Sequence, residues 1–304
     1  MPKFTVAAVQ AGSKLFDTPA TIALFADKLK EAAKTGADLA VFPEAFIGGY
    51  PKGIDFGVRV GMRQPEGREQ FRQYFDGAIE RTSPQMADIQ ALVKEAQINT
   101  VLGLIERDGG TLYCSSVAMG RDGEILSWHR KLMPTAMEKV IWGQGDGSTM
   151  KVAKSDMGVL SMAICWENYM PLFRSHLYDQ GTQVHCVSTV DDRDVWLPTM
   201  QAIALEGRCF VVSACQYMTV GDVRADWFEP IQGTAPDTVL IRGGSCIISP
   251  MGEVLAAPVF NESAIVSAEI DLDDIKRAKF DLDISGHYSR PDVVRLSVDT
   301  EPQR

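Results

Sequence analysis

Cys165 stands at a position that suits a nucleophile. It follows the apolar run GVLSMAI and precedes the polar segment WENY and a helix expected from about Pro171. A thiol at a strand end that faces a helix start lies near the positive end of the helix dipole, which lowers its pKa. Backbone N–H groups at such a turn can also stabilise an anion on a substrate. The alternative is that Cys165 only ends a buried strand.

A nucleophilic Cys165 needs a base, because a thiol with an ordinary pKa of about 8.5 is mostly protonated at neutral pH. Of the four histidines, His129 has the most suitable sequence context, but no Cys/His/Asn signature of the papain type is present. Glu44 is the other candidate, since it follows the apolar run LAVFP. Its carboxylate either points into a cleft shared with the thiol or lies at the surface.

Lys131 begins a third segment of interest, KLMPTAMEKVIWGQGDGS. An ammonium group near a thiolate and a carboxylate would stay charged and would stabilise anionic intermediates. Taken alone, the context of Lys131 favours a solvated loop residue over a catalytic one. Glu138 and Trp142 lie four residues apart in this segment, and its glycines let the backbone approach a ligand closely. The spacing GxxxxGK[ST] is absent, so the segment is not a phosphate loop.

The elements that must position these residues alternate between short apolar strands and helical patterns. Strands are expected at residues 4–11, 39–44, 100–105, 112–119, 125–128 and 158–164. Helices are expected from about 18 to 36, 84 to 97 and 171 to 180. The glycine-dense stretch 48–68 is expected to be a long loop. This pattern favours a mixed α/β sandwich whose sheets are covered by helices.

The composition excludes several classes of protein. The chain has 304 residues with no repeat, low-complexity tract or linker, so a single domain with a short tail from about 291 is expected. A net charge of −10 without any Lys/Arg-rich run argues against nucleic acid and anionic membranes as partners. No secretory signal and no apolar stretch of transmembrane length is visible, so a cytoplasmic location is expected.

In the cytoplasm the six cysteines are expected to be reduced. There is no C-x-x-C pair and no second ligand pair beside His185 and Cys186, so a zinc site is not expected. The cysteines other than Cys165 are interpreted as buried apolar residues, namely Cys114, Cys186, Cys209, Cys215 and Cys246.

Taken together, the motifs resemble one family closely. VFPEAFIGGYPKG surrounds Glu44, HRKLMPTAMEKVIWGQGDGS surrounds Lys131 and AICWENYMP surrounds Cys165, with further similarity from AAVQAG to SGHYSRPDVVRL. In this order they resemble the nitrilase, or carbon-nitrogen hydrolase, superfamily. CWEN resembles its true nitrilase branch, because the amidase and carbamoylase branches usually carry other residues after the nucleophile.

The resemblance implies a four-layer αββα sandwich and a set of roles. Cys165 would be the nucleophile, Glu44 would take the thiol proton and later activate water, and Lys131 would stabilise negative charge. Glu138 would be a second glutamate that positions the substrate. The residues implied to line the substrate site are Tyr50, Thr135, Trp142, Trp166 and Val190.

The implied reaction is hydrolysis of a nitrile to a carboxylic acid and ammonia, through a thioimidate and a thioester. It needs no metal and no organic cofactor. The competing hypotheses are an amidase, an N-carbamoyl hydrolase or a cyanide-hydrating enzyme of the same superfamily, and a non-catalytic binding scaffold. A small nitrile is the expected partner.

The resemblance also implies a homodimer or a higher homo-oligomer built from dimers. The helix near 170–180 would lie at the dimer interface through Leu172, Phe173 and Leu177. Alternatively, these side chains serve the protomer core.

Overall fold

The computed structural model describes residues 3–303, and its centre is a pair of six-stranded sheets. The first sheet has the order β16-β1-β2-β5-β6-β7. Its strands are β1 (Lys3–Gln10), β2 (Leu39–Val41), β5 (Asn99–Asp108), β6 (Thr111–Met119), β7 (Ile125–Arg130) and β16 (Ala264–Asp271). The second sheet has the order β15-β14-β11-β10-β9-β8. Its strands are β8 (Ala153–Ser155), β9 (Gly158–Ile164), β10 (Val184–Thr189), β11 (Phe210–Cys215), β14 (Cys246–Ile248) and β15 (Val254–Ala256).

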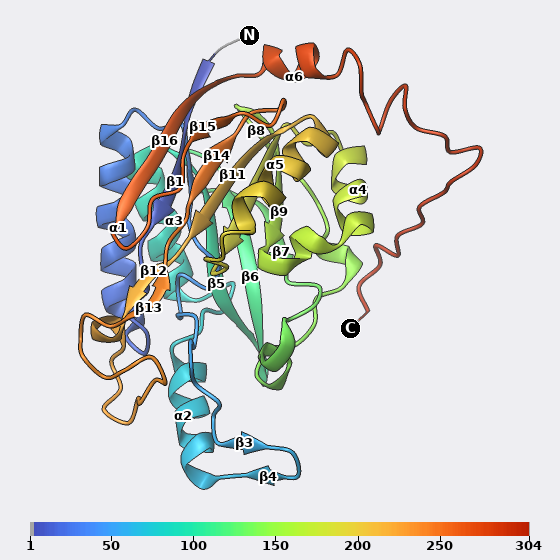
Figure 1. Ribbon diagram of the computed structural model, residues 1–304. Coiled ribbons are helices and arrows are strands. Elements are labelled where there is room, and N and C mark those ends of the chain that lie inside the picture. The colour runs from blue at the N-terminus through green and yellow to red at the C-terminus, as the bar shows by residue number, and fades with distance from the viewer. Residues whose placement is uncertain (1–2, 304) are drawn as a thin grey trace.

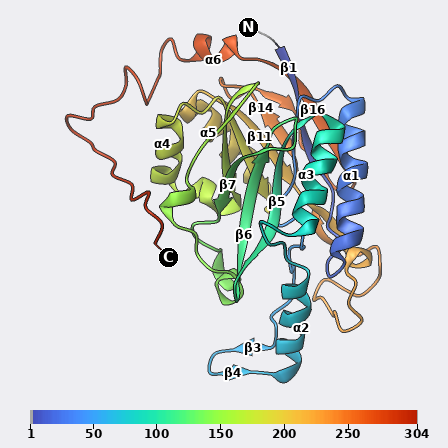
Figure 2. The same ribbon diagram turned by 180° about the vertical axis from the view of Figure 1, so that it is seen from behind.

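Helices cover the outer face of each sheet, as Figures 1 and 2 show from opposite sides. α1 (Thr18–Lys34) and α3 (Pro84–Ala96) pack on the first sheet, and α4 (Pro171–Asp179) and α5 (Trp196–Gly207) pack on the second. The expected four-layer αββα sandwich is therefore confirmed. Apolar side chains from the two facing sheets form the central core, among them Val6, Val41, Val101, Leu160, Val184 and Val212.

Parallel pairing at the centre of each sheet brings strand ends to the same edge. β2 pairs in parallel with β1 and β5, and β10 pairs in parallel with β9 and β11. The remaining pairs in the two sheets are antiparallel. Residues that follow the carboxyl ends of central parallel strands collect at one edge, which is where sites form in α/β proteins.

The prediction of a loop at 48–68 is partly wrong. It contains a short ribbon, β3 (Val58–Arg59) and β4 (Met62–Arg63), and it ends where α2 (Pro65–Asp76) begins. Within α2 only Gly67 and Tyr74 are buried, and its apolar face is short, formed by Phe71, Tyr74 and Phe75 near its end. Gly67 is required there because a Cβ would lie 1.8 Å from the carbonyl oxygen of Phe56.

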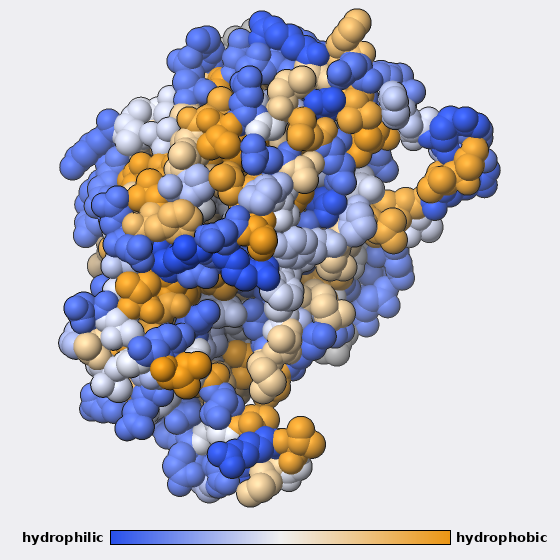
Figure 3. All heavy atoms as spheres, in the orientation of Figure 1, coloured by the Kyte–Doolittle hydropathy of each residue, from blue (hydrophilic) through white to orange (hydrophobic). Residues whose placement is uncertain are grey.

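Beyond the sandwich lie a small sheet and an extended tail. β12 (Tyr217–Thr219) pairs with β13 (Val239–Arg242), and the short helix α6 (Asp273–Ala278) follows β16. The chain after α6 loops away from the body and returns to it, as the space-filling view in Figure 3 shows. It returns near Val298, which packs against the cluster of Met150 and Phe173. No helix in residues 3–303 has the length and apolar character to cross a bilayer.

Candidate active site

Three strand ends from the two sheets bring Glu44, Lys131 and Cys165 together. Glu44 lies in the turn after β2, Lys131 directly follows β7, and Cys165 directly follows β9. The Nζ atom of Lys131 lies 2.6 Å from Oε1 of Glu44, and the Cys165 thiol interacts with the same carboxyl group. The three residues that the sequence singled out for chemistry therefore share one buried centre.

The turn that carries Glu44 is fixed by close backbone contacts. A Cβ on Gly103 of β5 would lie 2.1 Å from the carbonyl oxygen of Pro43, so only glycine lets this turn sit against the sheet. The side chain of Gln216 donates to the backbone carbonyl of Glu44 at 2.8 Å. The backbone of the turn is thereby held in place by both sheets, because Gln216 follows β11 of the second one.

Glu44 combines burial with an unpaired oxygen. Its side chain is fully buried, Oε1 accepts from Lys131 and from the Cys114 thiol at 3.6 Å, and Oε2 has no hydrogen-bond partner among the described residues. Burial raises the pKa of Glu44, the Lys131 ammonium opposes it, and the nearby Glu138 raises it further, to about 7 in all. A carboxyl group with that pKa can both accept and return a proton near neutrality.

Lys131 is the buried cation of the centre. Its side chain is fully buried, and Nζ donates to Glu44 and, at 2.7 Å, to Oε2 of Glu138. The Trp142 ring lies 5.6 Å from Nζ. Burial lowers the pKa of Lys131, but Glu44, the neighbouring thiols and Glu138 outweigh it and hold the pKa well above its usual range. The ammonium group therefore stays charged.

Cys165 occupies a strained turn and is not acidified. Its φ of 49° lies in the left-handed region, which costs about 1–3 kcal/mol for a non-glycine residue. Burial raises the pKa of its thiol, Glu44 adds to the rise, and Lys131 and Thr189 oppose it, with a net rise. The lowered pKa expected from a helix terminus is therefore wrong, because desolvation of the buried thiol dominates. The resting thiol is protonated and needs a base.

Glu138 extends the buried network toward Tyr50. It belongs to the 3-10 helix η1 (Ala136–Val140), and its Oε2 accepts from the backbone N–H of Thr135 at 2.7 Å. Oε1 accepts from the Tyr50 hydroxyl at 2.8 Å. The Tyr50 ring packs edge-on against Trp142 with centroids 5.8 Å apart.

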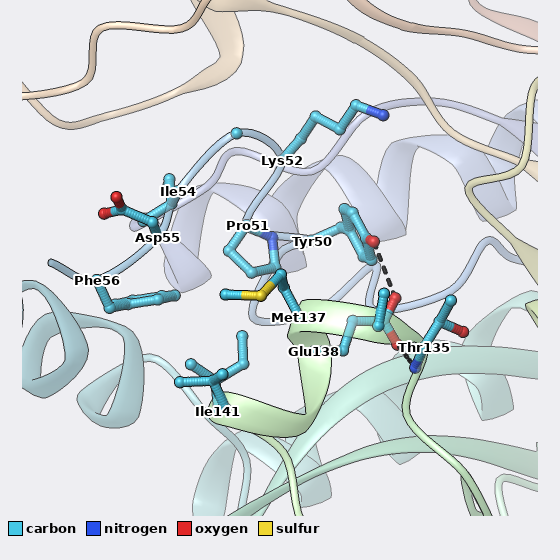
Figure 4. Close-up of a pocket in the computed structure, with 13 residues that line it drawn as sticks. Tyr50, Pro51, Lys52, Ile54, Asp55, Phe56, Thr135, Met137, Glu138 and Ile141 are labelled. Atoms are coloured by element: carbon cyan, nitrogen blue, oxygen red, sulfur yellow. Dashed lines mark hydrogen bonds between the residues drawn. The ribbon is translucent and has the colours of Figure 1, made fainter. Parts of the chain in front are cut away.

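Four of the five expected substrate-site residues gather near this network. A cavity of about 370 Å³ opens beside Tyr50, Thr135 and Glu138, as Figure 4 shows. Trp142 and Val190 lie in the buried apolar cluster that contains Cys165. Trp166 points elsewhere: it is 43% exposed, and its indole donates to Asp191 at 2.8 Å.

His129 does not serve as the base for the thiol. Its Nε2 atom lies 3.0 Å from Oε1 of Glu167, and its ring packs against Phe173. Sequence reasoning missed Glu167 and its neighbour Asn168, although both stand in the CWEN motif. Asn168 donates to the Cys165 carbonyl at 2.8 Å.

His185 fixes the orientation of Asn168. Its Nε2 lies 2.9 Å from Oδ1 of Asn168, and its Nδ1 lies 2.8 Å from the Ser161 hydroxyl. Burial lowers the pKa of His185 to about 3, so the ring is neutral. One ring nitrogen then donates to Asn168 and the other accepts from Ser161. A buried series of hydrogen bonds from Ser161 through His185 and Asn168 thus holds the strained turn at Cys165.

The helix expected at a dimer interface mostly serves the protomer. Phe173 and Leu177 of α4 are buried against Met150 and Ala163, while Leu172 is 68% exposed. Among residues 3–303 no group of three or more His, Cys, Asp or Glu side chains is arranged to hold a metal ion.

The paired sheets and the buried carboxylate–ammonium–thiol centre define a class of hydrolases, and the sequence comparison agrees. The sequence model of the carbon-nitrogen hydrolase family matches residues 5–280, so the chain belongs to this family. Within the family it belongs with the nitrilases. A nitrilase of Bradyrhizobium diazoefficiens is 51% identical over 301 residues, which cover 99% of this chain and 94% of the relative.

Other relatives are similar over nearly the same length. An aliphatic nitrilase of Sinorhizobium fredii is 48% identical over 100% of this chain and 98% of its own length. An arylacetonitrilase of Trametes versicolor is 49% identical over 97% of this chain and 96% of its own length.

Solved structures share the fold. The NitFhit protein of C. elegans has a TM-score of 0.76 at 18% identity, over 99% of this chain and 68% of that chain. A carbon-nitrogen hydrolase from Helicobacter pylori has a TM-score of 0.69 at 20% identity, over 91% of this chain and 92% of that chain.

Proposed function

We propose that this chain hydrolyses organic nitriles to carboxylic acids and ammonia, with Cys165 as the nucleophile. The geometric observation that supports the roles most directly is the unpaired Oε2 of Glu44 in the centre that Cys165 and Lys131 share. The nitrilase names of relatives at about half identity support the substrate class. They favour nitriles over the amidase, carbamoylase and binding-protein alternatives.

The first half of the proposed reaction forms a thioimidate. Glu44 takes the proton of the Cys165 thiol, and the sulfur attacks the nitrile carbon while one C–N π bond breaks. The nitrogen gains a proton, which Glu44 can return because its pKa is about 7. Lys131 stabilises the developing negative charge from its fixed position beside Glu44.

The second half releases both products. Glu44 activates a water molecule that adds to the thioimidate carbon, and the C–N bond breaks to release ammonia and leave a thioester. A second water adds to the thioester, the C–S bond breaks, and the acid leaves as the thiol is restored. Two waters and one nitrile thus give one acid and one ammonia. If the first tetrahedral intermediate expels the sulfur instead, an amide leaves.

The cavity beside Glu138 is suited to hold the substituent of the nitrile. Its walls include Ile54, Phe56, Met137 and Ile141, which are labelled in Figure 4. Apolar walls with few polar groups are typical of small-molecule sites. Tyr50, Thr135, Trp142 and Val190 are proposed to shape its inner end, while Trp166 is proposed to act only from outside it.

Replacing the proposed nucleophile tests the function. Cys165→Ala should abolish ammonia release from a panel of aliphatic and aromatic nitriles while the melting temperature is retained. Cys186→Ala is the matched control, because Cys186 is a buried thiol on β10 outside the proposed centre. Ammonia release by Cys165→Ala at the rate of the unaltered chain would refute the proposal, and so would release from amides but not from nitriles.

Assembly and location are also proposals. A homodimer or a larger assembly of dimers follows from the family resemblance, and the exposed Leu172 of α4 is a candidate contact. The cytoplasm is the proposed location. Size-exclusion chromatography with light scattering tests the assembly, and a monomer at micromolar concentration contradicts it. A single domain is proposed for the whole chain.

A further inference from the structure

Glu167 is a buried carboxylate in the CWEN motif that the proposed reaction does not use. It lies in the 3-10 helix η3 (Cys165–Tyr169), and its side chain is fully buried. A buried carboxylate is costly unless its oxygens are paired. Its partners therefore indicate what the side chain is for.

The two oxygens of Glu167 bind backbone groups beside two different residues of the centre. Oε1 accepts from the N–H of Leu132 at 2.6 Å, and Leu132 directly follows Lys131. Oε2 accepts from the N–H of Ile164 at 2.8 Å, and Ile164 directly precedes Cys165. One planar carboxylate thus connects the end of β7 in the first sheet with the end of β9 in the second.

His129 contacts both carboxylate oxygens of Glu167. Its Nε2 lies 3.0 and 3.1 Å from the two Glu167 oxygens, and its Nδ1 lies 3.3 Å from the Thr149 hydroxyl. Burial raises the pKa of Glu167, but His129 and the two backbone N–H groups outweigh it and hold the pKa below its usual value. Because the carboxylate accepts, Nε2 of His129 is the donor.

The charge state makes glutamate necessary at this position. A carboxylate offers two acceptor oxygens, so it can serve both backbone N–H groups at once. A carboxamide of the same shape offers one acceptor, and its NH₂ group would face the other N–H. One of the two strand ends would then lose its anchor and leave a buried donor unpaired.

We propose that Glu167 is a positioning residue that sets the spacing between the Lys131 ammonium and the Cys165 sulfur, with His129 fixing its carboxylate. This inference rests on the proposed function, in which Lys131 stabilises charge that develops on a substrate bound to Cys165. The two residues come from different sheets, so their separation depends on the contacts between the sheets. A displacement of about 1 Å at a reacting centre costs on the order of 100-fold in rate.

The first test replaces the anchor without changing its size. Glu167→Gln should lower kcat for ammonia release by about 100-fold. Its KM should change by no more than about twofold, because the cavity residues keep their places. The control is Asp38→Asn, since Asp38 also accepts from a backbone N–H, that of Thr5 at 2.9 Å, and pairs with Arg121 away from the centre. The control should keep the kcat of the unaltered chain.

The second test uses the histidine and works even if Glu167→Gln fails to fold. His129→Ala removes the side donor, whereas the amide NH₂ of His129→Gln can still donate to Glu167. We expect a lower kcat in His129→Ala and recovery of most of the loss in His129→Gln. A role in stability alone predicts that both variants keep the kcat of the unaltered chain.

Alkylation of Cys165 by iodoacetamide, followed by mass spectrometry, gives a readout independent of substrate. We expect slower labelling of Cys165 in Glu167→Gln than in the unaltered chain. If the unaltered chain releases no ammonia from any nitrile, the proposed function fails, and the labelling rates still test the positioning. Wild-type kcat and labelling in folded Glu167→Gln, or an equal loss of kcat in Asp38→Asn, would overturn the inference.

Discussion

Removing the Lys131 ammonium should destabilise the fold in a way that depends on pH. Nζ of Lys131 lies within 2.7 Å of one oxygen of Glu44 and one of Glu138, and its side chain is fully buried. Lys131→Met keeps an unbranched side chain of similar length and removes the charge. Two buried carboxylates then lose their cation. Breaking a buried pair in this way costs about 3–5 kcal/mol.

The direction of the pH dependence follows from the pKa of Glu44. The pKa of Glu44 is already raised to about 7, above its unfolded value of about 4.5, so its stabilising effect is lost as pH rises through that window. Without the ammonium, the folded pKa rises further, so the loss continues above pH 7. Above about pH 7 the stability gap between the unaltered chain and Lys131→Met therefore widens with pH, by about 1.4 kcal/mol per unit from Glu44.

Thermal unfolding at about pH 5.5 and about pH 8 measures this gap. At the higher pH we expect Lys131→Met to melt about 5–8 °C below the unaltered chain, and at the lower pH the difference should shrink. Adding Glu44→Gln to Lys131→Met removes one of the two buried carboxylates that have lost their cation. The double variant should therefore be more stable than the single one at the higher pH. Equal melting temperatures at both pH values would refute the reasoning.

Two further predictions concern the base and the strained turn. Because Glu44 must be ionised to take the thiol proton, kcat/KM for ammonia release should fall about tenfold per pH unit below about pH 7. Initial rates across this range measure it, and a flat profile down to pH 5 would contradict the role. Asn168→Ala removes the donor to the Cys165 carbonyl, so unfolding should become about 1–3 kcal/mol easier and kcat should drop. Chemical denaturation and ammonia assays check this, and wild-type values in both would show that Asn168 does not hold the turn.

Local patterns were sufficient for the main elements of the sandwich. The run before Cys165 and the Ser83-Pro84 helix start predicted β9 and α3, because apolar periodicity and helix caps are properties of neighbouring residues. The helix α2 was missed because its local pattern is short. Its apolar residues Phe71, Tyr74 and Phe75 cover only its last turns, whereas its first turn, residues 65–68, continues the glycine-dense stretch that was interpreted as a loop.

The sequence alone shows which residue types stand at the strand ends, and this placed Glu44, Lys131 and Cys165 at positions suited to chemistry. It did not determine their protonation, because a pKa depends on burial and on charges that arrive from elsewhere in the chain. The helix dipole suggested an acidic thiol, whereas desolvation in the folded protein raises the pKa of Cys165. His129 likewise had the context of a base, yet the meeting of the two sheets pairs it with Glu167. Only the tertiary structure brings those two sheets together.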